Sequence, residues 1–179
     1  MRYKKLVSLF FVFFLLQGVR ADTLEDFGWT KKVDDFEGTT SYLVSHENYA
    51  YSCDGSTLVG VYGLVSGELS KKTPLTLMYD FLGAKEVRRA GAFKWKGEDG
   101  SNSLEFECGN DYDDGWRRQC LVMAITPENA DSLANTDFIR LDFTSINLDL
   151  KEEGSTSGCS KLYTETRRIA SEYSKAINK

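Results

Sequence analysis

Apolar and polar residues alternate with a period of two in several segments, and this pattern constrains the fold more than any other feature of the chain. The alternation is clearest in residues 75–81, 93–96 and 104–108. Successive side chains of a β-strand point to opposite faces of the sheet, so each segment predicts a strand with one buried face. Asp80 falls on a face expected to meet solvent. The second segment carries lysines and the third glutamates on this face, which predicts complementary charges across an antiparallel pair.

Further strands are expected in the N-terminal third of the chain. Residues 31–38 are a charged approach to a first strand at 39–45, which is rich in β-branched and aromatic side chains. Residues 49–53 and 56–62 flank Asp54-Gly55, a dipeptide typical of tight hairpin turns. The sequence therefore predicts a hairpin here.

The remaining strands are predicted on either side of a short helix. The apolar run 120–125 has the length of a central strand, and residues 138–143 and 146–150 alternate again. Two segments, 63–74 and 97–102, are expected to be turn-rich connections between strands.

Two helices are expected in the C-terminal half. Thr126-Pro127-Glu128 combines an N-cap residue, a proline at the first helical position and an acid in the first turn, so a brief helix should run to about Ala134. The one long helix is indicated by residues that recur at intervals of three and four: Cys159, Leu162, Thr166, Ile169, Tyr173 and Ala176 or Ile177. Together the patterns predict a mainly β protein, an antiparallel β-sandwich or partly closed barrel with one C-terminal α-helix packed on it.

The first residues have the pattern of a secretory signal peptide. Three cations among residues 2–5 precede an apolar run of eleven residues, 6–16, broken only by a serine, and small residues precede a cleavage site after Ala21. The run is shorter than the roughly 20 residues that a membrane-spanning helix needs. Residues 1–21 are therefore expected to be removed, and 22–179 to form a single exported β-rich domain, periplasmic or secreted, with no membrane span.

Four cysteines remain after this cleavage, an even number for a chain in an oxidising compartment: Cys53, Cys108, Cys120 and Cys159. Three pairings are possible. We favour Cys108–Cys120, which closes a short loop between neighbouring strands, and Cys53–Cys159, which ties the C-terminal helix to the sheet. A zinc site is disfavoured because no C-x-x-C pair occurs and His46 is the only histidine.

The loop between Cys108 and Cys120 is the candidate partner-binding site. It combines carboxylates with aromatic and guanidinium groups, residue types enriched at interface hot spots, at Asp111, Tyr112, Asp113, Asp114, Trp116 and Arg117. Calcium is the competing interpretation, but the EF-hand spacing fails because Tyr112 and Leu121 stand where ligands belong. A solvated strand connection with Trp116 folded inward is the structural alternative.

The sequence gives no catalytic constellation and no cofactor motif. His46 has no serine-hydrolase partner motif, and no P-loop or dinucleotide fingerprint is present. A carboxylate-dependent hydrolase remains an alternative, since the chain has 27 acidic residues but none that the pattern singles out. The formal net charge is −5, and removal of residues 1–21 makes it more negative by taking away four cations. Nucleic acid is therefore excluded as a partner. Another protein is the expected partner, and no cofactor is expected.

Several short motifs resemble those of small exported bacterial proteins: Trp29, Val33-Asp34-Asp35-Phe36-Glu37-Gly38, Tyr51-Ser52-Cys53, Leu77-Met78-Tyr79-Asp80-Phe81 and a late cysteine beside a C-terminal helix. This arrangement is similar to the periplasmic β-sandwich proteins of the type VI secretion-associated VasI-like family. The resemblance implies a non-catalytic accessory role and supplies no site residues.

A second, shorter resemblance points to an inhibitor. Tyr51 and Cys53, followed by Trp95-Lys96-Gly97 and Cys108, are similar to periplasmic inhibitors of C-type lysozyme. An acidic chain would complement a basic lysozyme electrostatically. We therefore expect a non-catalytic binding or accessory protein, with an inhibitor of a host or competitor lysozyme-type enzyme as the alternative.

Overall fold

The protein was studied as a computed structural model, which describes residues 23–44, 51–52, 58–82, 90–97, 100–110, 117–142, 147–152 and 157–178. Its helical segments are η1 (Glu25–Phe27), α2 (Pro127–Ala134) and α3 (Ser157–Ile177). Its strands are β1 (Thr30–Asp34), β2 (Thr39–Val44), β3 (Tyr51–Ser52), β4 (Leu58–Ser66), β5 (Leu75–Leu82), β6 (Ala90–Gly97), β7 (Gly100–Asn110), β8 (Arg117–Ile125), β9 (Ile139–Asp142) and β10 (Asn147–Leu150). The predicted signal peptide, residues 1–21, lies outside this part of the chain.

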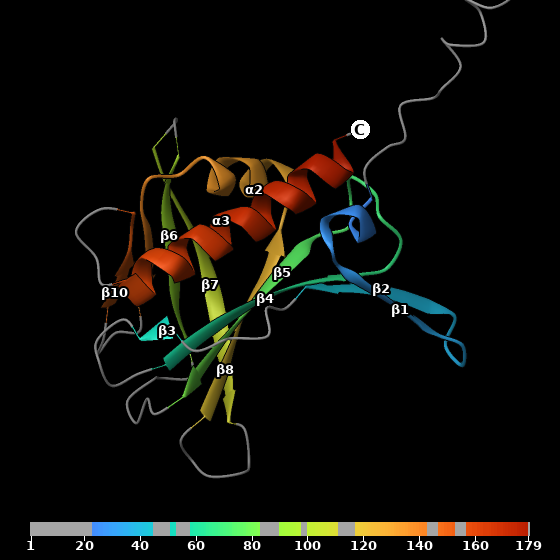
Figure 1. The fold of residues 1–179 in the computed structure, drawn as a ribbon, viewed down its shortest axis with the longest axis horizontal. Helices are drawn as coiled ribbons and strands as arrows, with labels where there is room; N and C mark the ends of the chain where they lie inside the picture. The colour runs from blue at the N-terminus through green and yellow to red at the C-terminus, as the bar shows by residue number, and fades with distance from the viewer. Residues whose placement is uncertain are drawn as a thin grey trace, which may run out of the picture.

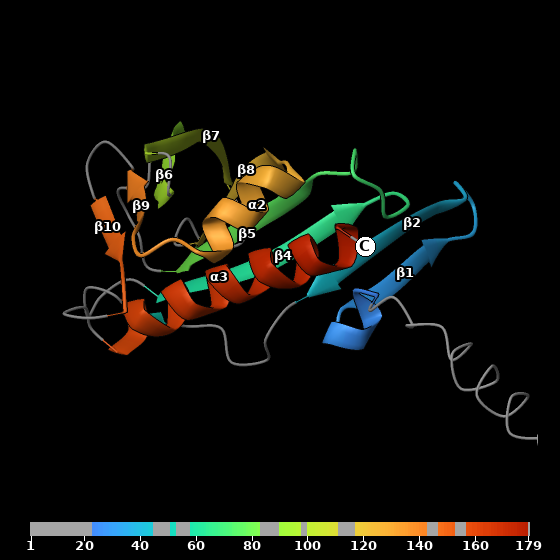
Figure 2. The same cartoon turned by 90° about the horizontal axis from the view of Figure 1, so that it is seen from above.

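All the described strands belong to one antiparallel sheet. Its order is β1-β2-β4-β5-β8-β7-β6-β9-β10, and β3 pairs with β4 beside this path. β1 and β10 are the two ends of the order and do not pair with each other in the described structure. The sheet curls from β4 round to β10, as Figures 1 and 2 show. The predicted fold class, mainly β and antiparallel with a C-terminal helix, is confirmed. Within the described residues the curved sheet does not close between β1 and β10, so it has the form of a partly closed barrel.

The two α-helices lie on the inner side of this curved sheet (Figure 2). α3 packs against α2 and contacts β3, β4 and β10. It therefore connects β4 with β10, which lie far apart in the order of the sheet. The predicted start of α2 is confirmed: the side chain of Thr126 accepts a hydrogen bond from the backbone N–H of Asn129 at 3.3 Å. α3 buries the predicted stripe and therefore supplies much of the core beneath the sheet.

Aromatic side chains fill the space between the sheet and the helices. The ring centroids of Tyr79 and Phe93 lie 6.0 Å apart, and those of Phe93 and Trp95 lie 5.6 Å apart. The polar ends of these rings reach the helices: the Tyr79 hydroxyl lies 3.1 Å from the hydroxyl of Thr166 on α3, and Trp95 Nε1 donates to Ser132 Oγ on α2 at 3.1 Å. Buried tyrosine and tryptophan commonly use their polar atoms in this way, and here they fix the helices in position.

Several strand boundaries differ from those predicted. Residues 30–34 form β1 instead of a charged approach to a strand, β4 continues to Ser66 through part of the expected connection, and β6 and β7 remain paired up to Gly97 opposite Gly100. In each case hydrogen bonding to a neighbouring strand extends regular structure into a segment with weak alternation. The hairpin predicted around Asp54-Gly55 agrees with the antiparallel pairing of β3 and β4, although the turn itself lies outside the described residues.

β6 and β7 pair antiparallel and carry lysines and glutamates on the same face, as expected, but these charges do not lie directly opposite each other. Lys94 lies opposite Ser103, and Glu105 lies opposite Ala92, so the charges are offset along the two strands. Lys94 instead forms an ion pair of 2.7 Å with Asp142 on β9, its other neighbour in the sheet. Asp80 was expected to meet solvent but is buried, with 6 % of its surface exposed.

The predicted central strand is confirmed, since β8 lies between β5 and β7. Its register against β5 shifts between Leu75 and Leu77, and Ala124 within the shift has a left-handed φ of 59°. Such a bulge inserts an extra residue into one strand. It explains why Met123, part of a continuous apolar run, is half exposed.

Candidate functional site

The base of the predicted recognition loop is built as expected. Cys108 and Cys120 lie directly opposite each other on β7 and β8 and form a disulfide, and the two strands remain paired up to Asn110 and Arg118. The loop residues Asp111, Tyr112, Asp113, Asp114 and Trp116 lie outside the described residues, as does the side chain of Arg117, at the first position of β8. A binding role for this loop therefore stays a prediction.

Cys159 is also disulfide-bonded, at the start of α3. Its expected partner, Cys53, lies outside the described residues, so the pairing Cys53–Cys159 stays a prediction. The position of Cys159 agrees with the expected role, because it is buried where α3 begins and α3 contacts β3 and β4.

Three buried tyrosine hydroxyls form hydrogen bonds that hold the fold together. The Tyr163 hydroxyl donates to the carbonyl oxygen of Thr136 at 2.6 Å, and the Tyr173 hydroxyl donates to that of Thr73 at 2.5 Å. Burial raises the pKa of Tyr173 to about 12, with a smaller contribution from the negative charge of Glu128. Burial also raises the pKa of Tyr79, against a smaller lowering by its hydrogen bond with Thr166. Within the described residues no group of three or more His, Cys, Asp or Glu side chains is placed to hold a metal ion.

A shallow pocket of about 290 Å³ lies beside α3, between its outer face and the end of α2. Arg167 at its wall donates from Nε to the carbonyl oxygen of Ala134 at 2.8 Å and from Nη1 to the Tyr163 hydroxyl at 2.9 Å. Arg168 forms ion pairs with Glu165 and Glu172. The Arg167 guanidinium therefore joins α3 to the end of α2, and that of Arg168 is paired within α3, so the pocket resembles a structural junction more than a ligand site.

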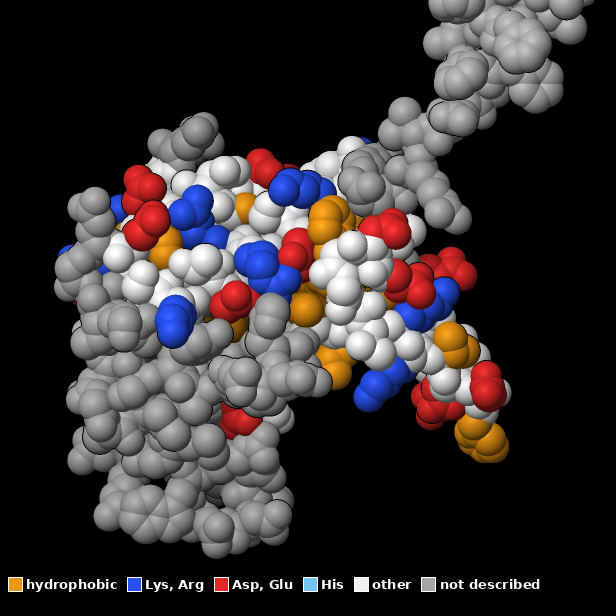
Figure 3. Space-filling view, in the orientation of Figure 1, with side chains coloured by type: hydrophobic (Ala, Val, Ile, Leu, Met, Phe, Trp, Pro, Cys, Tyr) orange, Lys and Arg blue, Asp and Glu red, His pale blue; other side chains and the backbone are white. Residues whose placement is uncertain are grey.

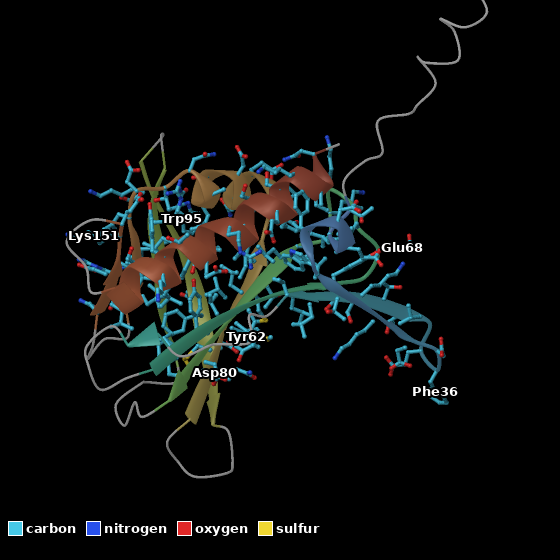
Figure 4. The ribbon with its side chains drawn as sticks, in the orientation of Figure 1. Phe36, Tyr62, Glu68, Asp80, Trp95 and Lys151 are labelled. Carbon is cyan, nitrogen blue, oxygen red and sulfur yellow. A yellow bond between two sulfur atoms is a disulfide. The ribbon has the colours of Figure 1, made fainter. Side chains whose placement is uncertain are left out.

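The most exposed apolar feature of the described chain is the arm formed by β1 and β2. The two strands pair from Thr30 opposite Leu43 to Asp34 opposite Thr39, and the hairpin projects from the body of the protein (Figure 1). Phe36 lies at its end, as Figure 4 shows, with 98 % of its surface exposed. Val33, on the preceding strand, is 56 % exposed.

The turn that carries Phe36 is held by hydrogen bonds. Asp34 Oδ1 accepts from the backbone N–H groups of Phe36 at 2.9 Å and Glu37 at 3.1 Å. The backbone N–H of Gly38 donates to the carbonyl oxygen of Asp34 at 2.7 Å. Gly38 has a left-handed φ of 65°, a conformation that favours glycine. The sequence Asp34-Asp35-Phe36-Glu37-Gly38 therefore specifies a defined turn that presents the phenyl ring to solvent.

The base of the arm is anchored in the core. Tyr42 and Val44 on β2 are buried, and Lys31 on β1 lies over the Tyr42 ring at 5.8 Å from its centroid. Trp29, directly before β1, is buried and donates from Nε1 to Glu172 Oε2 on α3 at 2.8 Å. The arm thus has a fixed base and an exposed end.

Charged side chains surround the exposed ring. Asp34, Asp35 and Glu37 are exposed, and the turn from Asp34 to Gly38 contains no cation. Figure 3 shows acidic side chains beside the hydrophobic end of the arm. An exposed aromatic ring on a preformed turn is suited to insertion into a pocket of another molecule, and the acids suit a basic surface around that pocket.

This site was not predicted from the sequence, because residues 31–38 were expected to be a charged approach to the first strand. A signal was present: Thr30 and Val33 precede an acidic segment that ends in glycine, and a β-branched and aromatic run follows at residues 39–44, a pattern of a hairpin with a longer turn. The lysines of β1 masked the strand, since Lys is depleted in strands on average but common at sheet edges.

Comparison with protein-family models, with curated proteins and with solved structures found no match to this chain. Both resemblances drawn from the sequence motifs stay predictions. Within the described residues, no helix combines the length and apolar character needed to cross a membrane.

Proposed function

We propose that this chain is an exported, non-catalytic binding or accessory protein that acts by contact with another protein. The observation that supports this most directly is Phe36, an almost fully exposed aromatic side chain on a hydrogen-bonded turn at the end of an anchored arm. Exposed aromatic residues at protruding positions are characteristic of interface anchors. The N-terminal sequence and the Cys108–Cys120 disulfide support export, since disulfides persist in oxidising compartments.

The proposal is tested by affinity capture. The mature chain, residues 22–179, is immobilised with its disulfides intact and incubated with the exported fraction of its host cells. We expect one protein to be retained in near-stoichiometric amount and to be lost when the Phe36→Ala variant is used. Retention of nothing above the level of an unrelated acidic disulfide protein contradicts the binding function. N-terminal sequencing of the cellular protein checks the export, with a start at residue 22 expected.

The alternative, inhibition of a lysozyme-type enzyme, is favoured by the combination of an aromatic ring and acidic side chains at the arm's end. Lysozymes of the C type are basic and bind their substrate in a cleft. We expect that, if this alternative holds, micromolar mature chain lowers the turnover of a C-type lysozyme on cell walls and the Phe36→Ala variant does so less. Unchanged turnover removes this alternative and leaves the general binding function standing.

A further inference from the structure

We propose that the end of the β1–β2 arm inserts Phe36 into an apolar pocket on a basic partner protein, and that Lys or Arg side chains at the rim of that pocket pair with Asp35 and Glu37. This inference rests on the proposed binding function and deepens it by naming the contact surface and the chemistry of the partner.

The first support is the exposure of the ring in a position where nothing in the fold requires a phenylalanine. Phe36 is 98 % exposed, so its side chain does not contribute to the core. A solvated turn is built as well by polar residues, and an exposed phenyl ring is unfavourable in water. Among the residues that the structure describes, the other two large apolar side chains with high exposure are Val33 and Met123, and each is near half exposed, so Phe36 stands apart from them. Its burial against a partner removes a large apolar area from water.

The second support is preorganisation of the turn. The bonds from Asp34 Oδ1 to two backbone N–H groups, and the left-handed Gly38, define the backbone on both sides of the ring. A turn that already has its bound conformation loses little conformational entropy on association. Asp34 is occupied by these backbone bonds, which leaves Asp35 and Glu37 as the carboxylates available to a partner.

The charges on the turn indicate which kind of molecule binds the end of the arm. Anionic phospholipids give a membrane surface a negative potential, and an acidic turn without a cation is repelled by such a surface. Contact between the arm ends of two copies would bring six exposed carboxylates together, which is unfavourable for the same reason. The two lysines nearest the turn, Lys31 and Lys32, lie farther along β1 toward the base, and Lys31 lies over the ring of Tyr42. Of these possible partners, a protein with a basic surface is the one whose charge complements the end of the arm.

The test uses site-specific photo-crosslinking in the host cells. Phe36→p-benzoylphenylalanine places the probe at the end of the arm with little change in shape. Lys161→p-benzoylphenylalanine is the control, because Lys161 is exposed near the start of α3, at the opposite end of the molecule from the arm (Figure 1). We expect an adduct with a protein of isoelectric point above neutrality from position 36 and not from position 161.

Capture alone does not establish the contact, so the crosslinked protein is purified and its binding is measured by calorimetry. We expect Phe36→Ala to weaken binding by about thirtyfold or more, the loss typical of an interface hot spot, and Phe36→Trp to retain most of it. The pair Asp35→Asn with Glu37→Gln should slow association and reduce its dependence on salt. Because all of these side chains are exposed and the turn is held by Asp34, circular dichroism should show unchanged folding.

Each other result overturns the proposal. An adduct of twice the chain's mass indicates a second copy, an adduct with lipid indicates a membrane, and an acidic protein contradicts the charge argument. Equal crosslinking at positions 36 and 161, or unchanged affinity of the Phe36→Ala variant, removes the arm as the contact surface. If the wild-type chain still captures a partner in these cases, the proposed binding function stands and only the arm's role fails.

Discussion

Trp29 and Phe36 are aromatic residues close together in the chain, yet their surroundings are opposite. Trp29 is 3 % exposed and bonded to Glu172, whereas Phe36 is almost fully solvated. The difference arises because α3, far along the chain, covers the base of the arm and does not extend over its end. The same contact makes Glu172 on α3 a partly buried partner of Trp29.

Gly63 shows how closely α3 approaches the sheet, and it carries the first prediction. A Cβ atom at this position would lie 2.6 Å from Ile169 Cγ2 and 2.6 Å from Trp29 Cη2. Gly63→Ala should therefore force α3 away from β4 and lower the free energy of unfolding by about 1–3 kcal/mol. Urea denaturation of the mature chain measures this change.

Gly109→Ala is the matched control, because Gly109 is also a strand glycine but has no atom within 4 Å of an added Cβ. Its free energy of unfolding should stay within about 0.5 kcal/mol of the wild type. Equal losses in the two variants would show that strand glycines in general, and not the α3 contact, set the effect.

At the scale of single elements, the β7–β8 hairpin shows what a disulfide contributes. Cys108 and Cys120 are separated by 12 positions and lie directly opposite each other in paired strands. The bond restricts the unfolded chain, and a closed loop of this size is worth about 3 kcal/mol. The pairing follows from the sheet register, so the disulfide reinforces a contact that the strands already make.

The double variant Cys108→Ala and Cys120→Ala should consequently lose about 3 kcal/mol of unfolding free energy in urea, while the far-ultraviolet circular dichroism of the native state stays the same. Peptide mapping of the non-reduced variant provides the control, with Cys53 and Cys159 expected in one linked fragment. An unchanged unfolding midpoint would mean that the hairpin is already restricted in the unfolded state.

The elements also show where sequence reasoning succeeds. The start of α2, the buried stripe of α3 and the face of β5 that carries Leu75, Leu77 and Tyr79 follow from local periodicity and capping chemistry. β1 was missed because its five residues are all exposed, so no apolar face marks it. An edge strand of this kind is stabilised by hydrogen bonds to β2 and not by burial of its own side chains.

For the whole molecule, α3 acts as the wall that fills the open side of the curved sheet. Three tyrosines lie at this junction, and burial raises the pKa of each: Tyr79, Tyr163 and Tyr173. Each hydroxyl forms a hydrogen bond to a residue distant in sequence: Tyr79 to Thr166, Tyr163 to Thr136 and Tyr173 to Thr73. The folded protein therefore favours the protonated form of these three tyrosines, because all three are buried between elements that come together only in the complete fold.

This arrangement predicts that stability falls at alkaline pH. Tyrosine in an unfolded chain titrates near 10, whereas the pKa of Tyr173 in the fold is about 12. Between these values the unfolded chain binds fewer protons than the folded one, so the free energy of unfolding decreases as pH rises. The stabilising contribution is complete below the unfolded pKa and is lost as pH rises through the folded pKa.

Urea denaturation at a series of pH values from about 8 to 11.5 measures this slope against the unfolded pKa of tyrosine. Tyr173→Phe should be less stable than the wild type at neutral pH, because the bond to Thr73 is lost, but its stability should decline less steeply above the unfolded pKa of tyrosine. If the free energy of unfolding falls equally steeply with pH in the two proteins, Tyr173 does not contribute to the loss of stability at alkaline pH.

The sequence by itself determined the β-rich class, both α-helices and most strand cores, because alternation, helical spacing and capping are local properties of a few neighbouring residues. It left three cysteine pairings possible, and the register of β7 and β8 places Cys108 opposite Cys120. Only the tertiary structure decided which strands are neighbours, that Lys94 pairs with Asp142, that Asp80 is buried and that Phe36 projects on an arm. Those properties depend on contacts between residues far apart in the chain. Local patterning specifies which face of a strand is apolar, whereas its register, its neighbours and its exposure are set when the curved sheet packs on α2 and α3.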